Sequence, residues 1–170
     1  MCQRIQSSKK KEFSGLSKLE SKERGFEFEK FLNLLFQLFK LAPKDSFRNT
    51  GEQIDGSFQM GNDIYLVEAK WHGSEIGQAD LLIFNEKVSG KATWTRGLFI
   101  SISGFTKEGL KAFSKGRPTS IIGMDGEDLK TILDRKFTLP EAIALKSRYA
   151  AETNEFFRPL PELKKRYAGK

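Results

Sequence analysis

Two carboxylates and one amine have the spacing of a site that could hydrolyse a phosphodiester. Asp55 lies in GEQIDGSF, and Glu68 and Lys70 follow thirteen and fifteen positions later in YLVEAKW. Carboxylate oxygens hold Mg²⁺ or Mn²⁺ and leave coordination positions for water and phosphate; such a cation polarises the phosphoryl oxygen and acidifies water. Lys70 could position or deprotonate the attacking water if a nearby cation lowers its pKa. Without metal, the carboxylates should keep Lys70 charged, so strict metal dependence is expected.

A β-hairpin must bring these side chains together. The pattern predicts a first strand, a turn and a second strand, at residues 53–59, 60–62 and 64–71. Residues two apart on a strand point to the same face. Glu68 and Lys70 should therefore point the same way, Ala69 should face the opposite layer, and the hairpin should place Asp55 opposite the pair.

The ordinary alternative is a cross-strand ion pair without chemistry. Such a pair contributes well under about 1 kcal/mol if it is exposed. Leu66, Val67 and Ala69 surround Glu68 with apolar positions, which indicates a buried strand. An unpaired acid or base would be costly there, so this context favours a functional site.

The rest of the chain alternates helices and strands. Helices are expected over 25–40 and 74–88, after Thr106, after Asp125, and from Pro140; buried strands are expected at 96–103 and 120–124. This alternation is typical of an α/β layer fold. Residues 1–24 are expected to be a mobile lead-in with a short helix.

The sequence around the carboxylates resembles the PD-(D/E)xK nuclease motif, with Ile54 in place of the usual proline. The flanking segments are similar to Mrr-type restriction endonuclease catalytic domains over about residues 25–133, and read GFEFEKFLNLLF, RGLFISISGFTKEGLKAF and SIIGMDGEDLKTIL. The resemblance implies a restriction-endonuclease-like core: a central mixed β-sheet flanked by helices, with the active site at one sheet edge. Many Mrr-type domains carry Gln where Glu68 stands. The acid retained here favours an active metal site.

The same resemblance implies a further acid from the first core helix. Glu27 and Glu29 both flank its apolar stripe, so helical geometry does not choose between them. In Mrr-type domains and related resolvases the acid follows a glycine by four, which selects Glu29 after Gly25. Its implied role is to hold a catalytic water or a second ion; a plain surface charge remains the alternative for either glutamate. The implied catalytic set is Glu29, Asp55, Glu68 and Lys70, with the three acids as ligands for Mg²⁺ or Mn²⁺.

Three other residues are candidates for contact with nucleic acid. Gln53 shares a strand face with Asp55 and could contact the scissile phosphate, although a structural hydrogen bond is the simpler alternative. Lys87 and Arg96 could line a DNA groove, or each could be a solvated charge. His72, the single histidine, is expected in an exposed loop.

Composition sets the remaining expectations. Of the net charge of +7 on 170 residues, residues 1–24 hold seven bases and three acids, and residues 140–170 hold seven bases and four acids. Basic flanks suit nucleic acid, or they serve only as solvated tails. The predicted division is a basic lead-in (1–24), a nuclease domain (25–137) and a C-terminal helical extension with a basic tail (138–170). One cysteine excludes an intrachain disulfide, and the absence of a signal or membrane segment predicts a cytoplasmic protein.

The resemblance implies a metal-dependent endodeoxyribonuclease for duplex DNA, acting in restriction or defence and leaving 5′-phosphate ends. Two alternatives stay open: a catalytically silent nucleic-acid-binding module on the same fold, and a nuclease for RNA or branched DNA. The last thirty residues could add specificity or form a homodimer.

Overall fold

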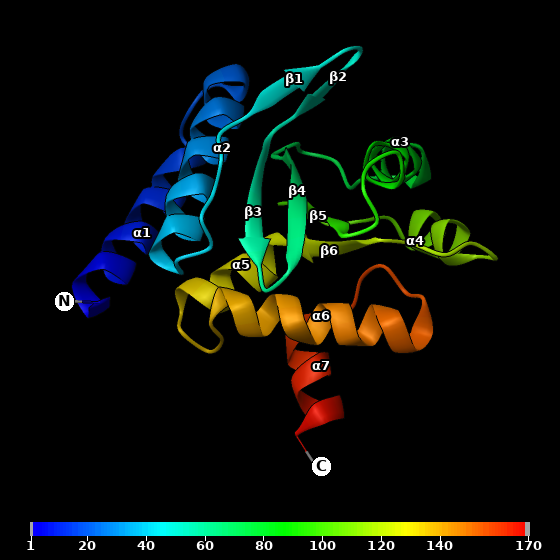
Figure 1. Cartoon of the computed structure of the whole chain (residues 1–170). Helices are drawn as coiled ribbons and strands as arrows, with labels where there is room; N and C mark the ends of the chain where they lie inside the picture. The colour runs from blue at the N-terminus through cyan, green and yellow to red at the C-terminus, as the bar shows by residue number, and fades with distance from the viewer. Residues whose placement is uncertain (1, 169–170) are drawn as a thin grey trace.

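A mixed four-stranded sheet forms the centre of the molecule (Figure 1). The computed structural model describes residues 2–168, with side chains from residue 8 onward. The strands, in spatial order, are β3 (Gly56–Met60), β4 (Asp63–Lys70), β5 (Thr95–Ser101) and β6 (Ile121–Asp125). β3 pairs antiparallel with β4, and the other two pairings are parallel. The central strands are apolar on both sides because helices cover both faces.

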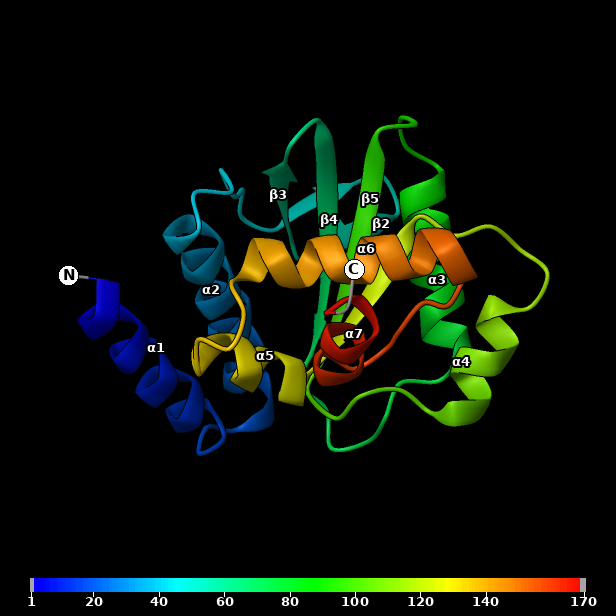
Figure 2. The same ribbon diagram turned by 90° about the horizontal axis from the view of Figure 1, so that it is seen from below.

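Helices cover the two faces of the sheet unequally (Figure 2). The core on one face is shared by α1 (Cys2–Leu16), α2 (Ser21–Leu38), α5 (Gly126–Leu133), α6 (Leu139–Thr153) and α7 (Leu160–Tyr167), with α1 packed on α2 and α5, and α7 packed on α6. The other face packs against α3 (Gln78–Ser89) and α4 (Lys107–Ser114). Successive strand residues supply the two cores in turn: Val67 and Leu98 face the first, Leu66 and Phe99 the second. The predicted fold class, a mixed sheet flanked by helices, is confirmed.

Side-chain caps begin the later helices where the sequence places them. Thr106 accepts a hydrogen bond from the Gly109 N–H at 3.0 Å, and Asp125 accepts one from the Asp128 N–H at 2.8 Å. Thr138 and Glu141 form a reciprocal capping box at the start of α6. The helix predicted from residue 74 begins only at Gln78, because Ile76 instead pairs with Phe105 in an isolated parallel bridge.

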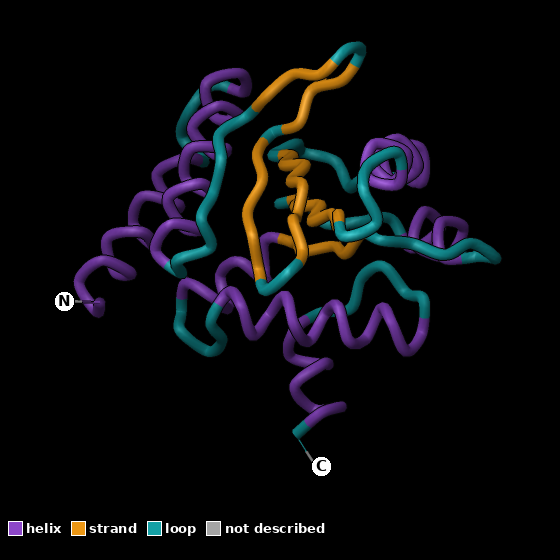
Figure 3. The backbone as a smooth tube through the Cα atoms, in the orientation of Figure 1, coloured by secondary structure: helices purple, strands orange, loops and turns teal. Residues whose placement is uncertain are grey.

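The predicted first hairpin strand, 53–59, is wrong in one respect: it is broken at Asp55 (Figure 3). Residues before the break form β2 (Glu52–Ile54), which pairs with β1 (Phe47–Asn49) in a separate two-stranded sheet. Residues after the break form β3, which pairs with β4. The chain changes partner at Asp55, and only residues 56–60 join the main sheet.

The two ends of the chain are built into the core. The segment expected as a mobile lead-in is largely α1, whose Phe13 and Leu16 are buried; the Phe13 ring contacts the rings of Phe28, Phe31 and Trp71. The expected C-terminal helical extension forms α6 and α7, which bury a set of apolar residues, Leu139, Ala142, Ile143, Tyr149, Leu160 and Leu163. None of the described helices has the length and apolar character to cross a membrane.

Candidate active site

The candidate site lies where β3 ends and β4 continues without a strand partner on that side. The last pair of the β3–β4 ladder is Gly56 with Val67, so Asp55 lies opposite Glu68. The Asp55 N–H donates to the Val67 carbonyl at 3.2 Å, and the Ala69 N–H donates to Asp55 Oδ2 at 2.9 Å. The Asp55 carboxylate therefore accepts the β4 hydrogen bond that a longer β3 would have accepted. The predicted placement of Asp55 opposite the Glu68–Lys70 segment is confirmed.

Glu68 is buried and binds two ammonium groups. Its Oε1 lies 2.9 Å from Lys70 Nζ, and its Oε2 lies 2.9 Å from Lys87 Nζ. Lys87 comes from α3 and also donates to the Gln53 backbone carbonyl at 3.1 Å. Glu68 can meet α3 because it points to the same face as Leu66, whereas Ala69 packs in the opposite core, as predicted.

One cavity of about 340 Å³ contains the whole predicted catalytic set. Figure 1 shows its setting, with α2 on one side of β4 and α3 on the other. Its wall includes the predicted residues Glu29, Gln53, Asp55, Glu68, Lys70 and Lys87. A second cavity of about 260 Å³ shares Glu29, Asp55 and Ala69 with the first and continues toward Lys44 and Asp45. The carboxylates thus lie where two hollows of the surface meet.

The structure distinguishes between the two helix glutamates. Glu29 lines both cavities, and burial raises its pKa to about 7, with a further contribution from the negative charge of Asp55. Glu27 instead lies 2.8 Å from Lys30 Nζ in an i,i+3 ion pair, outside both cavities. Geometry therefore favours Glu29, in agreement with the choice that the resemblance implied.

The pKa values of Asp55 and Lys70 are both raised, for different reasons. Burial raises the pKa of Asp55, the Ala69 N–H partly offsets this, and Glu68 adds a smaller raising effect. Burial alone would lower the pKa of Lys70, but its hydrogen bond to Glu68 and that residue's charge outweigh burial, so the net pKa is raised. Lys70 is therefore an ammonium ion in the metal-free protein, which is the charge state that the sequence predicts.

The donor chemistry fits a divalent cation, although the carboxylates are not gathered around a shared position. Within residues 2–168, no three acidic, histidine or cysteine side chains stand close enough to form a ligand cluster. Glu29, Asp55 and Glu68 nonetheless share one cavity, and Asp55 and Glu68 each raise the pKa of Glu29. A divalent cation would relieve this repulsion between the carboxylates, and Mg²⁺ is a cation that carboxylate oxygens bind well. To reach Glu68 it must compete with the ammonium groups of Lys70 and Lys87.

The structure does not bring every predicted residue to this place. Arg96 pairs with Tyr65 in the β4–β5 ladder, whereas Lys70 pairs with Ser101, so Arg96 lies at the other end of the sheet. Its guanidinium contacts Asp63 and nearby carbonyls, and the proposed role of Arg96 in lining a DNA groove at the site has no geometric support.

His72 is a cavity residue that was expected only as an exposed loop histidine. It is exposed, as expected, but it also lines the cavity, and its carbonyl accepts a hydrogen bond from the Ser103 hydroxyl. The sequence did carry a signal for His72, because it lies two positions after Lys70, as Lys70 lies two positions after Glu68. Trp71 and the start of α2 at Ser21 also line the cavity, and their sequence carries no comparable signal.

Comparison with known proteins gives a family match over most of the chain. Residues 21–133 match the Mrr_cat family, described as restriction endonuclease. Two solved structures are similar: MspJI restriction endonuclease in complex with a 27-mer oligonucleotide (13% identity, TM-score 0.41, 81% of this chain and 35% of that chain), and AF1548, a protein of unknown function (14% identity, TM-score 0.41, 85% and 99%). This chain therefore spans about a third of the MspJI chain. No curated protein matches significantly.

Proposed function

The chain belongs to the Mrr_cat family of restriction endonucleases, and we propose that it is a metal-dependent endodeoxyribonuclease that hydrolyses phosphodiester bonds in duplex DNA. A role in restriction or defence accords with the family. The observation that carries the proposal is the convergence of Glu29, Asp55, Glu68 and Lys70 in one cavity, within the matched residues.

Asp55 and Glu68 are the proposed ligands for Mg²⁺ or Mn²⁺, with Glu29 as a third carboxylate that lines the same cavity. When bound, the cation supplies Lewis acidity, which polarises a phosphoryl oxygen and acidifies water. Asp55 is well placed for this because its position is fixed by the Ala69 N–H, 2.9 Å from Oδ2. Glu29, with a pKa of about 7, exchanges a proton near neutral pH and can orient water at the site.

Lys70 and Lys87 are the proposed positively charged groups that contact the phosphate. Lys70 is an ammonium ion that Glu68 holds at the cavity wall, where it can bind a non-bridging phosphate oxygen and balance charge that develops in the transition state. Lys87 binds the other oxygen of Glu68 from α3, so it can hold the carboxylate in place or bind an adjacent phosphate. Gln53, which lies in β2 two positions before Asp55, lines the same cavity.

The direct test is conversion of supercoiled plasmid with Mg²⁺ or Mn²⁺. We expect cleavage by the wild type and at least a hundredfold loss in Asp55→Ala and Lys70→Ala. Asp55→Ala removes a proposed cation ligand, and Lys70→Ala removes the positive charge proposed to contact the phosphate, so each should raise the activation free energy by several kcal/mol. Glu27→Gln is the matched control, since Glu27 is an acid of the same helix that lies outside the cavity. Equal cleavage by wild type and both alanine variants would refute the proposed site.

A second candidate function is a nucleic-acid-binding module without catalysis. The observation that favours it is the engagement of both Glu68 oxygens by lysines, so that a cation must compete with two ammonium groups for that carboxylate. A panel of duplex, single-stranded, branched and RNA substrates, each with metal titration, separates the candidates. Binding without cleavage of any substrate supports the module; cleavage confined to RNA or junctions changes the substrate class.

A further inference from the structure

A hollow rich in basic residues lies between α4 and the segment that joins α6 to α7. Its volume is about 500 Å³. The end of α6 contacts the end of α4, because the Asn154 side chain donates to the carbonyls of Ser114 and Arg117. We call this hollow the α4 groove; its walls are Lys107, Leu110, Lys111, Lys115, Phe157 and Arg158.

Three lysines form one edge of the α4 groove at helical spacing. Lys107, Lys111 and Lys115 are exposed, follow one another at intervals of four, and make no ion pair with a described residue. Successive members are about 6 Å apart along the helix axis. Phosphates of one DNA strand rise about 3.4 Å each along the axis and also rotate around it, so neighbouring phosphates are about 7 Å apart through space. The lysine spacing therefore suits a contact with successive phosphates of one strand.

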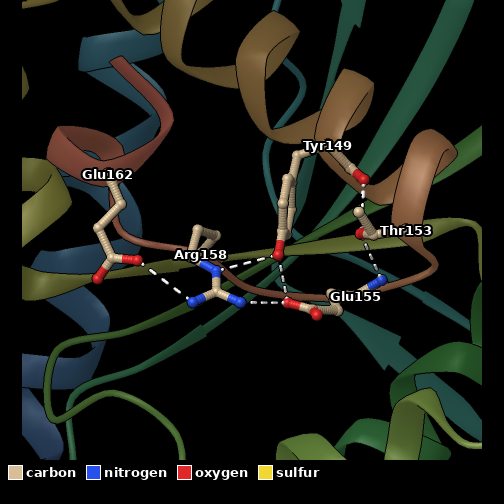
Figure 4. A network of polar contacts seen from close by, with 5 residues as sticks. All are labelled: Tyr149, Thr153, Glu155, Arg158 and Glu162. Atoms are coloured by element: carbon tan, nitrogen blue, oxygen red, sulfur yellow. Dashed lines mark hydrogen bonds and ion pairs between the residues drawn. The ribbon is translucent and has the colours of Figure 1, made fainter. Parts of the chain in front are cut away.

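The opposite wall is rigid and carries no free negative charge. Glu155 is the acid that lines it, and Arg158 binds this carboxylate at 2.7 Å while the Tyr149 hydroxyl donates to it (Figure 4). Arg158 also reaches Glu162 at 3.2 Å. The neighbouring Phe156 is buried against Gly123, where an added Cβ would lie 2.5 Å from its ring. The ion pairs of Arg158 and the burial of Phe156 thus hold this wall in position, and the three lysines are the unpaired charges of the groove.

The loop that leads into α4 contacts the chain at the catalytic cavity. The Ser103 hydroxyl donates to the carbonyl of His72, a cavity residue, and Ile76 exchanges backbone hydrogen bonds with Gly104 and Thr106. Lys107 is the next residue after Thr106. Lys107 is four positions after Ser103, a reach of at most about 14 Å, and α4 carries the lysines about 12 Å further. Duplex DNA seated at the cavity would need only about eight base pairs to reach Lys115.

We propose that the α4 groove is a second nucleic-acid contact, which binds the phosphate backbone of duplex DNA that extends beyond the catalytic cavity. This inference rests on the proposed DNA function and adds the surface that holds the flanking DNA. The occupant is duplex DNA rather than an acidic peptide because the lysine spacing is close to the phosphate spacing of one strand, and because the loop that leads into α4 contacts a residue of the catalytic cavity.

The test compares two double variants that each remove two positive charges: Lys111→Gln/Lys115→Gln in the groove, and Lys40→Gln/Lys136→Gln at exposed sites outside the groove and the basic flanks. Affinity for a labelled 30-base-pair duplex is measured in EDTA across a salt series, so that no cleavage interferes. We expect the groove variant to bind roughly tenfold more weakly near 0.1 M salt, and its salt slope to fall by about 2. The control should change little in either quantity. Thermal melts should be unchanged, since all four lysines are exposed.

Equal losses in the two double variants would overturn the inference, because the effect would then be net charge alone. Tighter binding of a polyglutamate peptide than of the duplex would also overturn it and would assign the groove to an acidic partner. Plasmid cleavage is scored separately, at saturating protein. A groove variant that binds like the control yet cleaves refutes the inference alone, whereas a protein with the expected salt slopes and no cleavage refutes only the proposed activity.

Discussion

Asp55 has a structural task as well as its proposed chemical one. Its carboxylate accepts the Ala69 N–H at the point where β4 loses its strand partner, and the chain changes from one sheet to the other at this residue. This explains why a carboxylate is held, partly buried, at a sheet edge. The motif spacing in the sequence placed Asp55 opposite Glu68 correctly, but it did not indicate that both Glu68 oxygens would be bound by lysines.

Glu29 gives the metal-free protein a defined pH dependence. Its pKa is about 7 in the folded state against 4.5 ordinarily, so the folded state holds more protons than the unfolded state between those values. Stability should therefore fall as the pH rises from about 4.5 to 7, by about 1 kcal/mol once solvent screening at this half-buried position is allowed for. Urea unfolding in EDTA across that range should show the fall in the wild type and in Glu27→Gln, and not in Glu29→Gln. A Glu29→Gln curve parallel to the wild type would contradict this account.

Among the elements, those with local signals could be predicted. The buried strands β5 and β6 are continuous apolar runs, and Thr106, Asp125 and Thr138 cap helices with side-chain oxygens. β1 could not be predicted in this way. Its residues, Phe47–Asn49, carry no apolar alternation, and their pairing with β2 depends on where the main sheet ends.

A buried ion pair connects the C-terminal helices to the core. Lys146 of α6 lies 2.6 Å from Asp128 of α5, and both are almost fully buried. Asp128 also accepts the Leu160 N–H at 2.9 Å, and Lys146 donates to the Arg158 carbonyl at 2.9 Å. One pair thus links α5, α6 and the start of α7.

Breaking this pair from one side should be costly. Lys146→Met leaves a buried carboxylate without its counter-ion, and we expect a loss of roughly 3–5 kcal/mol in the free energy of unfolding. Lys146→Met/Asp128→Asn should lose less, because no charge remains buried and asparagine still accepts the Leu160 N–H. Chemical denaturation measures both, with the exposed Lys130→Met/Glu127→Gln pair as the control, expected within about 1 kcal/mol of wild type. A double variant as unstable as the single one would contradict the electrostatic explanation.

At the scale of the whole molecule, the family match ends before the core does. The matched residues stop at 133, yet α6 and α7 bury apolar side chains in the same core as α2 and the sheet. The family resemblance located the segment that carries the candidate site and indicated the α/β class. It carried no information on residues 138–170, because their contacts with the core depend on α6 crossing beneath the sheet (Figure 2).

The predicted division at residue 137 can be tested by truncation. A chain of residues 1–137 would expose the surface that Leu139, Ile143, Leu160 and Leu163 cover. We expect it to aggregate or to lose its cooperative thermal transition, because large apolar surfaces rarely remain exposed in monomers. A chain of residues 1–168 is the control. A monomeric 1–137 fragment with a sharp transition would show that the helical extension is a separable unit.

The measurement that tests the central claim most directly is calorimetric titration of Mn²⁺ into the wild-type chain and into Asp55→Asn and Glu27→Gln at pH 8. At that pH Glu29, with its pKa of about 7, is mostly ionised. The proposed site predicts saturable binding by the wild type and Glu27→Gln, and at least a tenfold weaker affinity in Asp55→Asn, which keeps the shape of the side chain and removes its charge. Equal Mn²⁺ affinity in all three proteins would contradict a cation site at Asp55.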